Sequence, residues 1–208
     1  MIMHRRTAKD VFDDWALDYH ADGMEKSHWQ SVQEAFQIIP DSDGNYLEIG
    51  FGNGYGIKYL ATHQYKTGQC YGLDISPNMV QKASQTVSDL KNVHLEAGDF
   101  LTWTPRKNIQ FSCIFSMEVF YYFEDIRKGI IKASSLLKPN GRLMVLVNHY
   151  LENPESHTWP GDLNTPMALW SRKDYLKGFQ SAGFRDIHQC RLDQKSNLPG
   201  TLCTVGIK

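Results

Sequence analysis

The chain of 208 residues has a composition close to that of ordinary globular proteins, with 41% hydrophobic and 22% charged residues, which argues against a disordered chain or a membrane protein. Its formal net charge of -1 provides no overall attraction to nucleic acid or to anionic lipid. This length suits one sizeable hydrophobic core and is short for two.

The start of the chain and its cysteines bear on where the protein works. Residues 1–6 are basic, but no apolar segment of signal-peptide type follows them. No apolar run approaches the roughly 20 residues that a membrane-spanning helix needs. The four cysteines are far apart, without a Cys-x-x-Cys pair, and most lie in apolar strand-like runs that are typical of buried reduced thiols. We therefore expect a cytoplasmic protein with no membrane span.

Two helices are predicted before the first strand. Thr7 and Asp10 form a capping-box pattern at the start of the first helix, which 21–23 is expected to end. The second helix is predicted from about Ser27 to Pro40. Large apolar side chains on these helices could form a lid over a bound ligand, although ordinary core packing is the alternative: Trp15, Tyr19, Met24 and Trp29.

The middle of the chain alternates between strand and helix patterns. Predicted strands cover residues 46–49, 69–75, 93–97, 109–115 and 142–147, and predicted helices cover 55–65, 77–90 and 126–137. This alternation predicts a doubly wound, largely parallel sheet. Residues 148–169 are predicted as a long irregular loop with a functional role. A helix from Ser171 and two closing strands, 184–192 and 201–207, complete the chain.

Three glycines at alternate positions connect the first predicted strand to the next helix, in the segment Glu48-Ile49-Gly50-Phe51-Gly52-Asn53-Gly54. Such a turn lets backbone lie against a nucleotide-like ligand. Asp74 and Asp99 end the next two strands. In an open parallel sheet the carboxyl ends of the strands meet at one crevice, so the turn and both aspartates are expected to face one ligand. Helix capping is the alternative role for either aspartate.

A dinucleotide is one possible ligand of this turn. The dinucleotide fingerprint, Gly-x-Gly-x-x-Gly/Ala, requires a small last residue for close packing of helix on strand. Tyr55 occupies that place here, which weakens the prediction of an NAD-dependent oxidoreductase, although Gly56 beside it keeps that alternative open.

Several segments, in order and at suitable spacing, resemble the class I S-adenosylmethionine-dependent methyltransferases. The matching segments are Glu48 to Gly54, Gly72-Leu73-Asp74-Ile75-Ser76-Pro77, Gly98-Asp99-Phe100, Phe111 to Glu118, and Leu137-Lys138-Pro139-Asn140-Gly141. The resemblance covers about residues 45–148. Within the class it is greatest to the small-molecule branch that includes quinone-biosynthesis methyltransferases (methyltransferase type 11/12 domain).

The resemblance implies a Rossmann-like sheet of seven strands, mostly parallel with an antiparallel last strand, and helices on both faces. It implies one domain over 1–208, with a helical lid (1–40), a cofactor-binding core (45–148) and a substrate-side loop, helix and strands (149–208). The implied cofactor is S-adenosyl-L-methionine. The implied cofactor-binding residues are Glu48, Gly50, Phe51, Gly52, Asn53, Gly54, Asp74, Ile75, Asp99, Phe100, Ser116 and Tyr19.

Within this set, the resemblance assigns separate parts of the cofactor. Gly50 and Gly52 would lie against its methionine portion, and Asp74 would hold the ribose hydroxyls. Ile75 would pack on the adenine, and Asp99 would accept a hydrogen bond from its amino group. Phe51 stands where many members of the class carry cysteine or another small residue.

The acceptor side is less well defined. His149 and Tyr121 are candidate catalytic residues, because a methyl acceptor with a hydroxyl or an ammonium group needs a base. His157 and Tyr122 are further candidates, and Glu118 could bind the acceptor or cap a short segment. These residues form no recognised catalytic constellation, and no metal is expected.

The sequence favours transfer of a methyl group to a small organic acceptor by a monomer or homodimer, with no nucleic-acid partner. Methylation of nucleic acid or protein is an alternative, but Ser116-Met117-Glu118-Val119 replaces the [Asn/Asp]-Pro-Pro-[Tyr/Phe] signature of enzymes that methylate nucleic-acid amino groups. A non-catalytic cofactor-binding protein is a further alternative.

Overall fold

The computed structural model of the chain describes residues 5–18, 20–106, 109–195 and 199–208. In these residues seven strands form one sheet in the order β3-β2-β1-β4-β5-β7-β6. The strands are β1 (Asn45–Ile49), β2 (Gln69–Asp74), β3 (Val93–Ala97), β4 (Phe111–Met117), β5 (Leu137–Val147), β6 (Arg185–Leu192) and β7 (Thr201–Ile207).

The pairing of the strands confirms the predicted sheet. Strands β1 to β5 pair in parallel, and β7 is antiparallel to both β5 and β6. After β1 the chain adds β2 and β3 on one side, and it then returns to place β4 and β5 on the other. The winding therefore reverses between β1 and β4, which is where ligands bind in doubly wound sheets.

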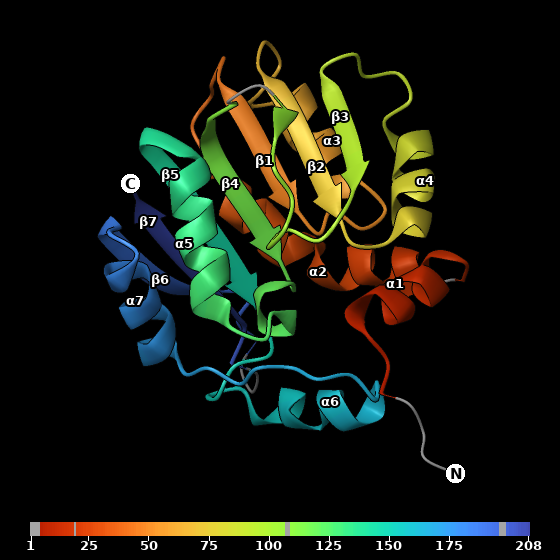
Figure 1. Cartoon of the computed structure of the whole chain (residues 1–208), viewed down its shortest axis with the longest axis vertical. Helices are drawn as coiled ribbons and strands as arrows, with labels where there is room; N and C mark the ends of the chain where they lie inside the picture. Colours follow the sequence, from red (N-terminus) through yellow and green to blue (C-terminus); the bar gives the residue numbers. More distant parts are fainter. Residues whose placement is uncertain (1–4, 19, 107–108, 196–198) are drawn as a thin grey trace.

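Helices cover both faces of the sheet (Figure 1). The helices are α1 (Ala8–Ala16), α2 (His20–Phe36), α3 (Tyr55–Thr62), α4 (Pro77–Thr86), α5 (Ile126–Leu136), α6 (Trp159–Asp162) and α7 (Arg172–Ser181), with 3-10 turns η2 (Phe120–Tyr122) and η3 (Pro154–Thr158). One buried cluster joins α2, α3 and α4 to one face, and a second joins α5, α7 and η2 to the other. Alternate residues of β1, Tyr46 and Leu47, belong to opposite clusters, as the two-residue period of a strand requires.

Local capping explains where several helices begin. Thr7 and Asp10 form the predicted capping box of α1. The Ser76 hydroxyl accepts a hydrogen bond from the Met79 amide at the start of α4, and Asp125 caps α5 in the same manner. These contacts satisfy amides that lack partners within the helix.

The predicted break at 21–23 is wrong, because α2 begins at His20 and continues through Gly23. Glycine inside an exposed helix costs only about 1 kcal/mol relative to alanine, and no atom lies within 4 Å of the position of a Gly23 Cβ. The chain turns earlier, after α1, where the Asp18 carboxylate accepts a hydrogen bond of 2.7 Å from the His20 amide.

Residues 148–169, predicted as an irregular loop, contain η3 and α6. The segment is joined to the start of the chain, since the Arg6 amide donates to the Asn164 carbonyl at 2.9 Å and the Thr165 hydroxyl donates to the Arg6 carbonyl at 3.2 Å. The structure thus places this segment against the start of the chain.

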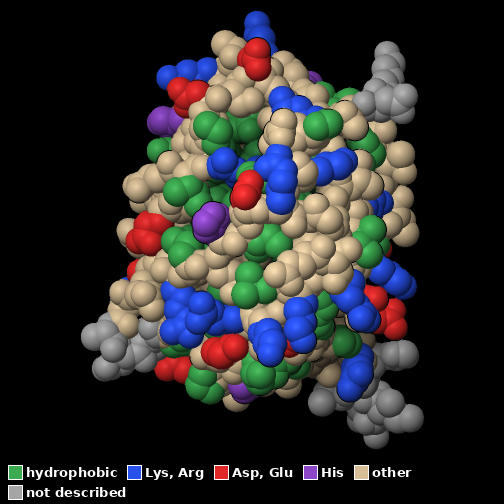
Figure 2. Space-filling model, turned by 90° about the vertical axis from the view of Figure 1, so that its left-hand side faces the viewer, with side chains coloured by type: hydrophobic (Ala, Val, Ile, Leu, Met, Phe, Trp, Pro, Cys, Tyr) green, Lys and Arg blue, Asp and Glu red, His purple; other side chains and the backbone are tan. Residues whose placement is uncertain are grey.

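The outer surface beside β6 and α7 carries Lys and Arg side chains interspersed with acidic and apolar ones (Figure 2). Cys70, Cys113 and Cys203 are buried free thiols, as predicted, whereas Cys190 is exposed on β6. In the part of the chain that the structure describes, none of the helices has the length and apolar character needed to cross a membrane.

Candidate active site

A cavity of about 330 Å³ lies where the winding of the sheet reverses. Its wall is formed by residues at and just beyond the ends of four strands: 48–53 at β1, 73–75 at β2, 98–101 at β3 and 117–119 at β4, with Tyr55, Tyr122, Phe123 and Glu124. Helices α1 and α2 close the remaining side, through Ala8 and Phe12 and through Met24 and His28. In Figure 1 these two helices lie across the ends to which the arrows of β1 to β4 point.

The glycine turn brings backbone to the cavity. Gly50 and Gly52 have φ angles of 74° and 56°, in the left-handed region that favours glycine. A Cβ on Gly50 would lie 2.2 Å from the Val119 Cγ2, whereas a Cβ on Gly52 would meet no atom within 4 Å. The backbone of Gly52 therefore lines the cavity with open space beside it.

Gly54 does not line the cavity. It begins α3 at φ 88°, and a Cβ there would lie 3.0 Å from the Ala83 Cβ of α4. Gly54, which was predicted to bind the cofactor, therefore stands where α3 packs closely on α4. Asn53, beside it, does line the cavity and donates a hydrogen bond of 2.8 Å to the Glu25 carboxylate of α2.

Asp74 holds the loops around it together. Its carboxylate accepts hydrogen bonds from the Gly52 amide at 3.0 Å and from the Ser76 amide at 2.9 Å. Burial nevertheless raises the pKa of Asp74 to about 6. Each carboxylate oxygen can accept more than one hydrogen bond, so the Asp74 side chain that braces the turn can also receive hydroxyls from the cavity.

Glu48 is the second buried carboxyl at this end. The Tyr46 hydroxyl donates to it at 2.9 Å, and burial raises the pKa of Glu48 to about 8. A Cβ at Gly56 would lie 2.7 Å from a Glu48 oxygen. The small residue at position 56 thus makes room for Glu48, which explains the glycine that kept the dinucleotide alternative open.

The adenine side of the predicted site also faces the cavity. Ile75, Asp99 and Phe100 line it, and the exposed Asp99 accepts a hydrogen bond of 2.8 Å from the Leu101 amide. Phe51 lines the cavity as well, but its ring also packs on the backbone of Gly72, where a Cβ would lie 2.6 Å from the ring. Phe51 therefore combines a core position with a place in the cavity wall.

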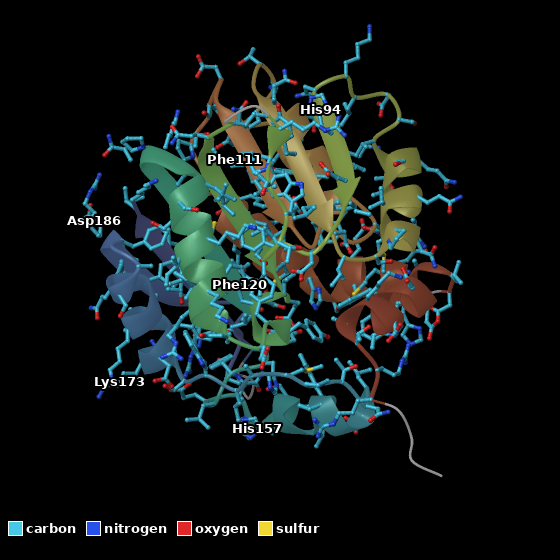
Figure 3. The ribbon with its side chains drawn as sticks, viewed as in Figure 1. His94, Phe111, Phe120, His157, Lys173 and Asp186 are labelled. Carbon is cyan, nitrogen blue, oxygen red and sulfur yellow. The ribbon has the colours of Figure 1, made fainter. Side chains whose placement is uncertain are left out.

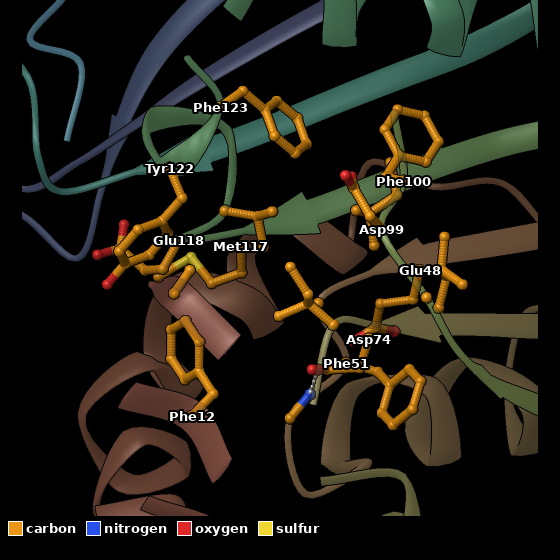
Figure 4. Close-up of a pocket in the computed structure, with 18 of the residues that line it drawn as sticks. Phe12, Glu48, Phe51, Asp74, Asp99, Phe100, Met117, Glu118, Tyr122 and Phe123 are labelled. Carbon is orange, nitrogen blue, oxygen red and sulfur yellow. Dashed lines mark hydrogen bonds between the residues drawn. The ribbon is translucent and has the colours of Figure 1, made fainter. Parts of the chain in front are cut away.

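Glu118 lies in the cavity wall at the end opposite Asp74 and Asp99 (Figure 4). It has φ 59°, an unusual conformation for a residue with a side chain, and only 9% of it is exposed. The Tyr121 hydroxyl donates to one of its oxygens at 3.0 Å, and the Asn148 amide donates to the other. Burial raises the pKa of Glu118 to about 7 against the effect of these two donors.

Neither of the two candidate catalytic residues lines the cavity. Tyr121 is buried and reaches the cavity only through Glu118. His149 is 1% exposed, its Nδ1–H donates to the Ser156 carbonyl at 3.0 Å, and its ring lies between those of Tyr121 and Trp159. Desolvation lowers the pKa of His149. These contacts are those of a packed structural histidine.

Ser116, His157 and the loop 148–169 also lie outside the cavity wall. Ser116 is fully buried in β4 and does not line it. His157 is exposed in η3 and lies at the outer edge beside α6 (Figure 3). Tyr19 lies outside the described residues. The predicted loop 148–169, which the structure describes throughout, contributes no residue to the cavity wall.

Phe12 and His28 are among the wall residues that had no functional assignment from the sequence. Phe12 of α1 packs edge-on against Tyr122, with ring centroids 5.4 Å apart. His28 of α2 is partly buried, and desolvation lowers its pKa to about 4. His28 stands four residues after Met24, the spacing of neighbours on one helix face, but the sequence does not indicate what that face would cover.

Helices α1 and α2 are joined to the glycine turn after β1 and to the segment after β2, including the start of α4. The Ser76 hydroxyl donates to the Asp13 carboxylate at 2.6 Å, and the Asn78 side chain donates to the Asp13 carbonyl at 3.1 Å. Lys82 of α4 pairs with Asp22 of α2 at 3.0 Å. Together with the Asn53–Glu25 bond, these contacts fix α1 and α2 along this side of the cavity.

The fold and this site define a doubly wound protein with one covered cavity at the point where the winding reverses, the place where such folds hold nucleotide-like ligands. A family model described as "Methyltransferase domain" matches residues 21–189. The chain therefore belongs to the methyltransferase-domain family, of the class I type that uses S-adenosylmethionine.

Individual relatives agree with this assignment. A chain in a complex of the Haloferax volcanii Trm112 methyltransferase activator with a candidate methyltransferase is 28% identical, with a TM-score of 0.85 over 97% of this chain and 98% of that one. The N-methyltransferase NodS of Bradyrhizobium japonicum, solved with S-adenosylhomocysteine, shares the fold at 19% identity, with a TM-score of 0.69 over 94% and 92% of the two chains.

Among curated sequences, the uncharacterised methyltransferase YcgJ of Bacillus subtilis is 31% identical over 57% of this chain and 46% of its own length. The matched region covers between 28% and 52% of the lengths of the four curated relatives. At most about half of each of these relatives is therefore compared with this chain.

The residues present fit S-adenosylmethionine. The open space beside Gly52, the buried Asp74 carboxylate and the apolar side chains of Ile75 and Phe100 line one cavity. Of the twelve residues predicted to bind the cofactor, nine line it: Glu48, Gly50, Phe51, Gly52, Asn53, Asp74, Ile75, Asp99 and Phe100.

Proposed function

We propose that this protein transfers a methyl group from S-adenosylmethionine to a small organic acceptor. The observation that carries the proposal is a cavity covered by α1 and α2, in which the glycine turn, Asp74 and Asp99 stand at one end and Glu118 and Tyr122 at the other (Figure 4). A volume of about 330 Å³ lies in the range of small-molecule sites. The covering helices favour an acceptor that can be enclosed.

The cofactor, when bound, supplies a methyl group activated by its sulfonium. We assign Gly50 and Gly52 to its methionine portion, since backbone there can approach a ligand closely. Asp74 would receive the ribose hydroxyls, and Asp99 the adenine amino group. Ile75 and Phe100 would pack against the adenine.

The chain's own contribution is orientation and exclusion of water. Phe12, Met24 and Met117 give the acceptor end an apolar wall, and a dry site favours a reaction in which positive charge is lost. Holding acceptor and cofactor in line can supply a large part of the rate. We propose that α1 and α2 act as the lid that achieves this, and that they open for exchange of ligands.

A protein or nucleic-acid acceptor is the second candidate. Separately from the acceptor, the similar Haloferax volcanii chain was solved in complex with an activator protein, which favours a protein partner for this chain as well. The enclosed cavity favours the small molecule, because a macromolecular acceptor would have to insert a side chain or a base beneath α1 and α2. Size-exclusion chromatography with a purified Trm112-type protein tests whether this chain also takes an activator.

Isothermal titration calorimetry with S-adenosylmethionine, S-adenosylhomocysteine and NAD tests the proposed function. We expect both sulfur compounds to bind and NAD not to bind. The Asp74→Ala variant should bind S-adenosylhomocysteine at least tenfold more weakly, because the change removes both the ribose acceptor and the brace of the Gly52 amide. Binding of NAD alone would refute the proposal, and unchanged affinity in Asp74→Ala would remove the assigned role of Asp74.

A further inference from the structure

The charged side chains that line the cavity are of one sign. Five carboxyl groups line it, those of Glu48, Asp74, Asp99, Glu118 and Glu124. Among the residues that the structure describes, no Lys or Arg side chain does so. Lys and Arg are present in number on the outer surface (Figure 2), so the sign of the cavity is a local property and does not follow from the net charge of -1.

Two of these carboxyl groups, those of Glu118 and Glu124, belong to the segment after β4 and not to the turns after β1, β2 and β3. Figure 4 shows Glu118 beside Met117, Tyr122 and Phe12, with Asp74 and Asp99 on the other side of the cavity. Glu124 is exposed, whereas Glu118 is nine-tenths buried. A buried charge interacts more strongly than an exposed one, because water screens it less. Glu118 therefore dominates the electrostatics of the acceptor end.

The Glu118 side chain is fixed in place. Its two oxygens accept hydrogen bonds from the Tyr121 hydroxyl and the Asn148 amide, one each. Its left-handed backbone, with φ 59°, is a conformation that the surrounding structure must enforce. Each oxygen keeps a lone pair for a further donor. The structure thus holds a buried hydrogen-bond acceptor at the cavity wall.

Aromatic rings and thioethers surround this acceptor. Phe12 and Tyr122 meet edge-to-face, and Met24, Met117 and Phe123 complete the wall. Ammonium groups bind favourably to carboxylates and to the faces of aromatic rings. An anionic group here would be desolvated without a cationic partner, which is costly.

Three lysines of neighbouring elements have partners elsewhere. Lys9 pairs with Asp13, and Lys82 pairs with Asp22. Lys132, whose Nζ lies 5.5 Å from the centre of the Phe100 ring, donates to the carbonyls of Leu101 and Trp103. These side chains offer no counter-charge to a carboxylate or phosphate in the cavity.

We infer that the methyl acceptor carries an amine, that Glu118 is the residue that selects it, and that carboxylate- and phosphate-bearing acceptors are rejected. The inference rests on the proposed function and narrows its substrate class. Tyr121 is then a positioning residue, which orients the Glu118 carboxylate without touching the acceptor.

Binding of matched compounds to the complex with S-adenosylhomocysteine tests this inference. The probes are 2-phenylethylamine, 2-phenylethanol and phenylacetate, with hexylamine, hexanol and hexanoate as an aliphatic series. Titrations at pH 8 keep the amines protonated and leave Glu118, with its pKa of about 7, mostly ionised. We expect the amine of at least one series to bind at least tenfold more tightly than its matched carboxylate.

Variants identify the residue responsible. Glu118→Gln keeps the shape and removes the charge, and it should weaken amine binding at least tenfold while alcohol binding changes less than threefold. Glu155→Gln, the same change at an exposed residue of η3 outside the cavity, should leave amine binding unchanged. If Glu118→Gln does not fold, Tyr121→Phe serves in its place, with an expected threefold or greater loss for amines only.

Three outcomes would overturn the inference: carboxylates that bind as tightly as amines, no amine binding at millimolar concentration in either series, or undiminished amine binding in Glu118→Gln. Failure of the proposed function gives a different result, since S-adenosylhomocysteine itself would then not bind. Titration with S-adenosylhomocysteine therefore tests the proposed function, and titration of its complex with amines and carboxylates tests the substrate class.

Discussion

The two ends of the cavity are built in different ways. The cofactor end consists of backbone turns that follow β1, β2 and β3, and most of its positions belong to short contiguous motifs. The acceptor end is assembled from the neighbouring helices α1 and α2 and from the segment that follows β4, about 90 residues further along the chain. A cofactor that is shared by a whole class can be held by backbone, whereas the acceptor is selected by side chains that differ from one protein to the next.

The largest expected effect on stability and cofactor affinity comes from substitution of Gly50, where the glycine turn packs against Val119 of the acceptor end. A Cβ in the Gly50→Ala variant would lie 2.2 Å from Val119, beside Glu118, on backbone at φ 74°. We expect a loss of about 2–4 kcal/mol in the free energy of unfolding and at least a tenfold loss of S-adenosylhomocysteine affinity. Urea denaturation and calorimetry measure the two effects.

Gly23→Ala is the matched control for this change. Gly23 lies in an exposed part of α2 with free space around it, so alanine there should raise stability by about 0.5–1 kcal/mol. If Gly50→Ala behaved like Gly23→Ala, the close contact between the two ends would have no energetic consequence.

The His149→Ala variant tests whether the segment at the end of β5 belongs to the acceptor site. Because the His149 ring is packed between Tyr121 and Trp159, His149→Ala should lower the free energy of unfolding by about 2 kcal/mol. S-adenosylhomocysteine affinity should change less than twofold, and methylation of any acceptor found in the amine panel less than threefold. A tenfold fall in methylation with normal stability would instead restore His149 to the acceptor site.

The smallest expected effect concerns pH and the cofactor end. The folded-state pKa of Glu48, about 8, lies above its ordinary value of 4.5, so the folded protein retains a proton that the unfolded chain has released. This contribution to stability is complete below about pH 4.5 and is lost as the pH rises through 8.

Between pH 6.5 and pH 8, the wild-type protein should therefore lose about 1.5 kcal/mol more of its unfolding free energy than Glu48→Gln. Comparing the two proteins cancels the other titrating groups, and urea denaturation at both pH values provides the measurement. Equal losses would mean that Glu48 is already ionised in the folded state at pH 6.5.

The sequence predicts the sheet well because buried strands and capped helices have local signatures. Strands β3 and β7 begin and end at the predicted residues. The error at Gly23 arose because one glycine was weighed as a helix breaker, although tertiary contacts along α2 offset its small cost.

Most residues at the cofactor end of the cavity could be predicted from the sequence, whereas several residues at the acceptor end could not. Gly50, Gly52 and Asp74 could be located because turn chemistry and strand-end position occur together in the sequence. Phe12 and His28 could not, since their place depends on how α1 and α2 pack across the sheet. His149 was placed in the site by its strand-end position, but neighbouring aromatic rings enclose it.

The hydrogen bonds Ser76–Asp13 and Asn53–Glu25 have a consequence for the order of events in turnover. They connect each covering helix to a loop that would touch the cofactor, so a ligand that orders those loops also favours the closed helices. Such coupling is reciprocal in free energy. If α1 and α2 act as the lid proposed above, we expect their separation from these loops to be required for release of the demethylated product, and this opening to limit the rate of turnover.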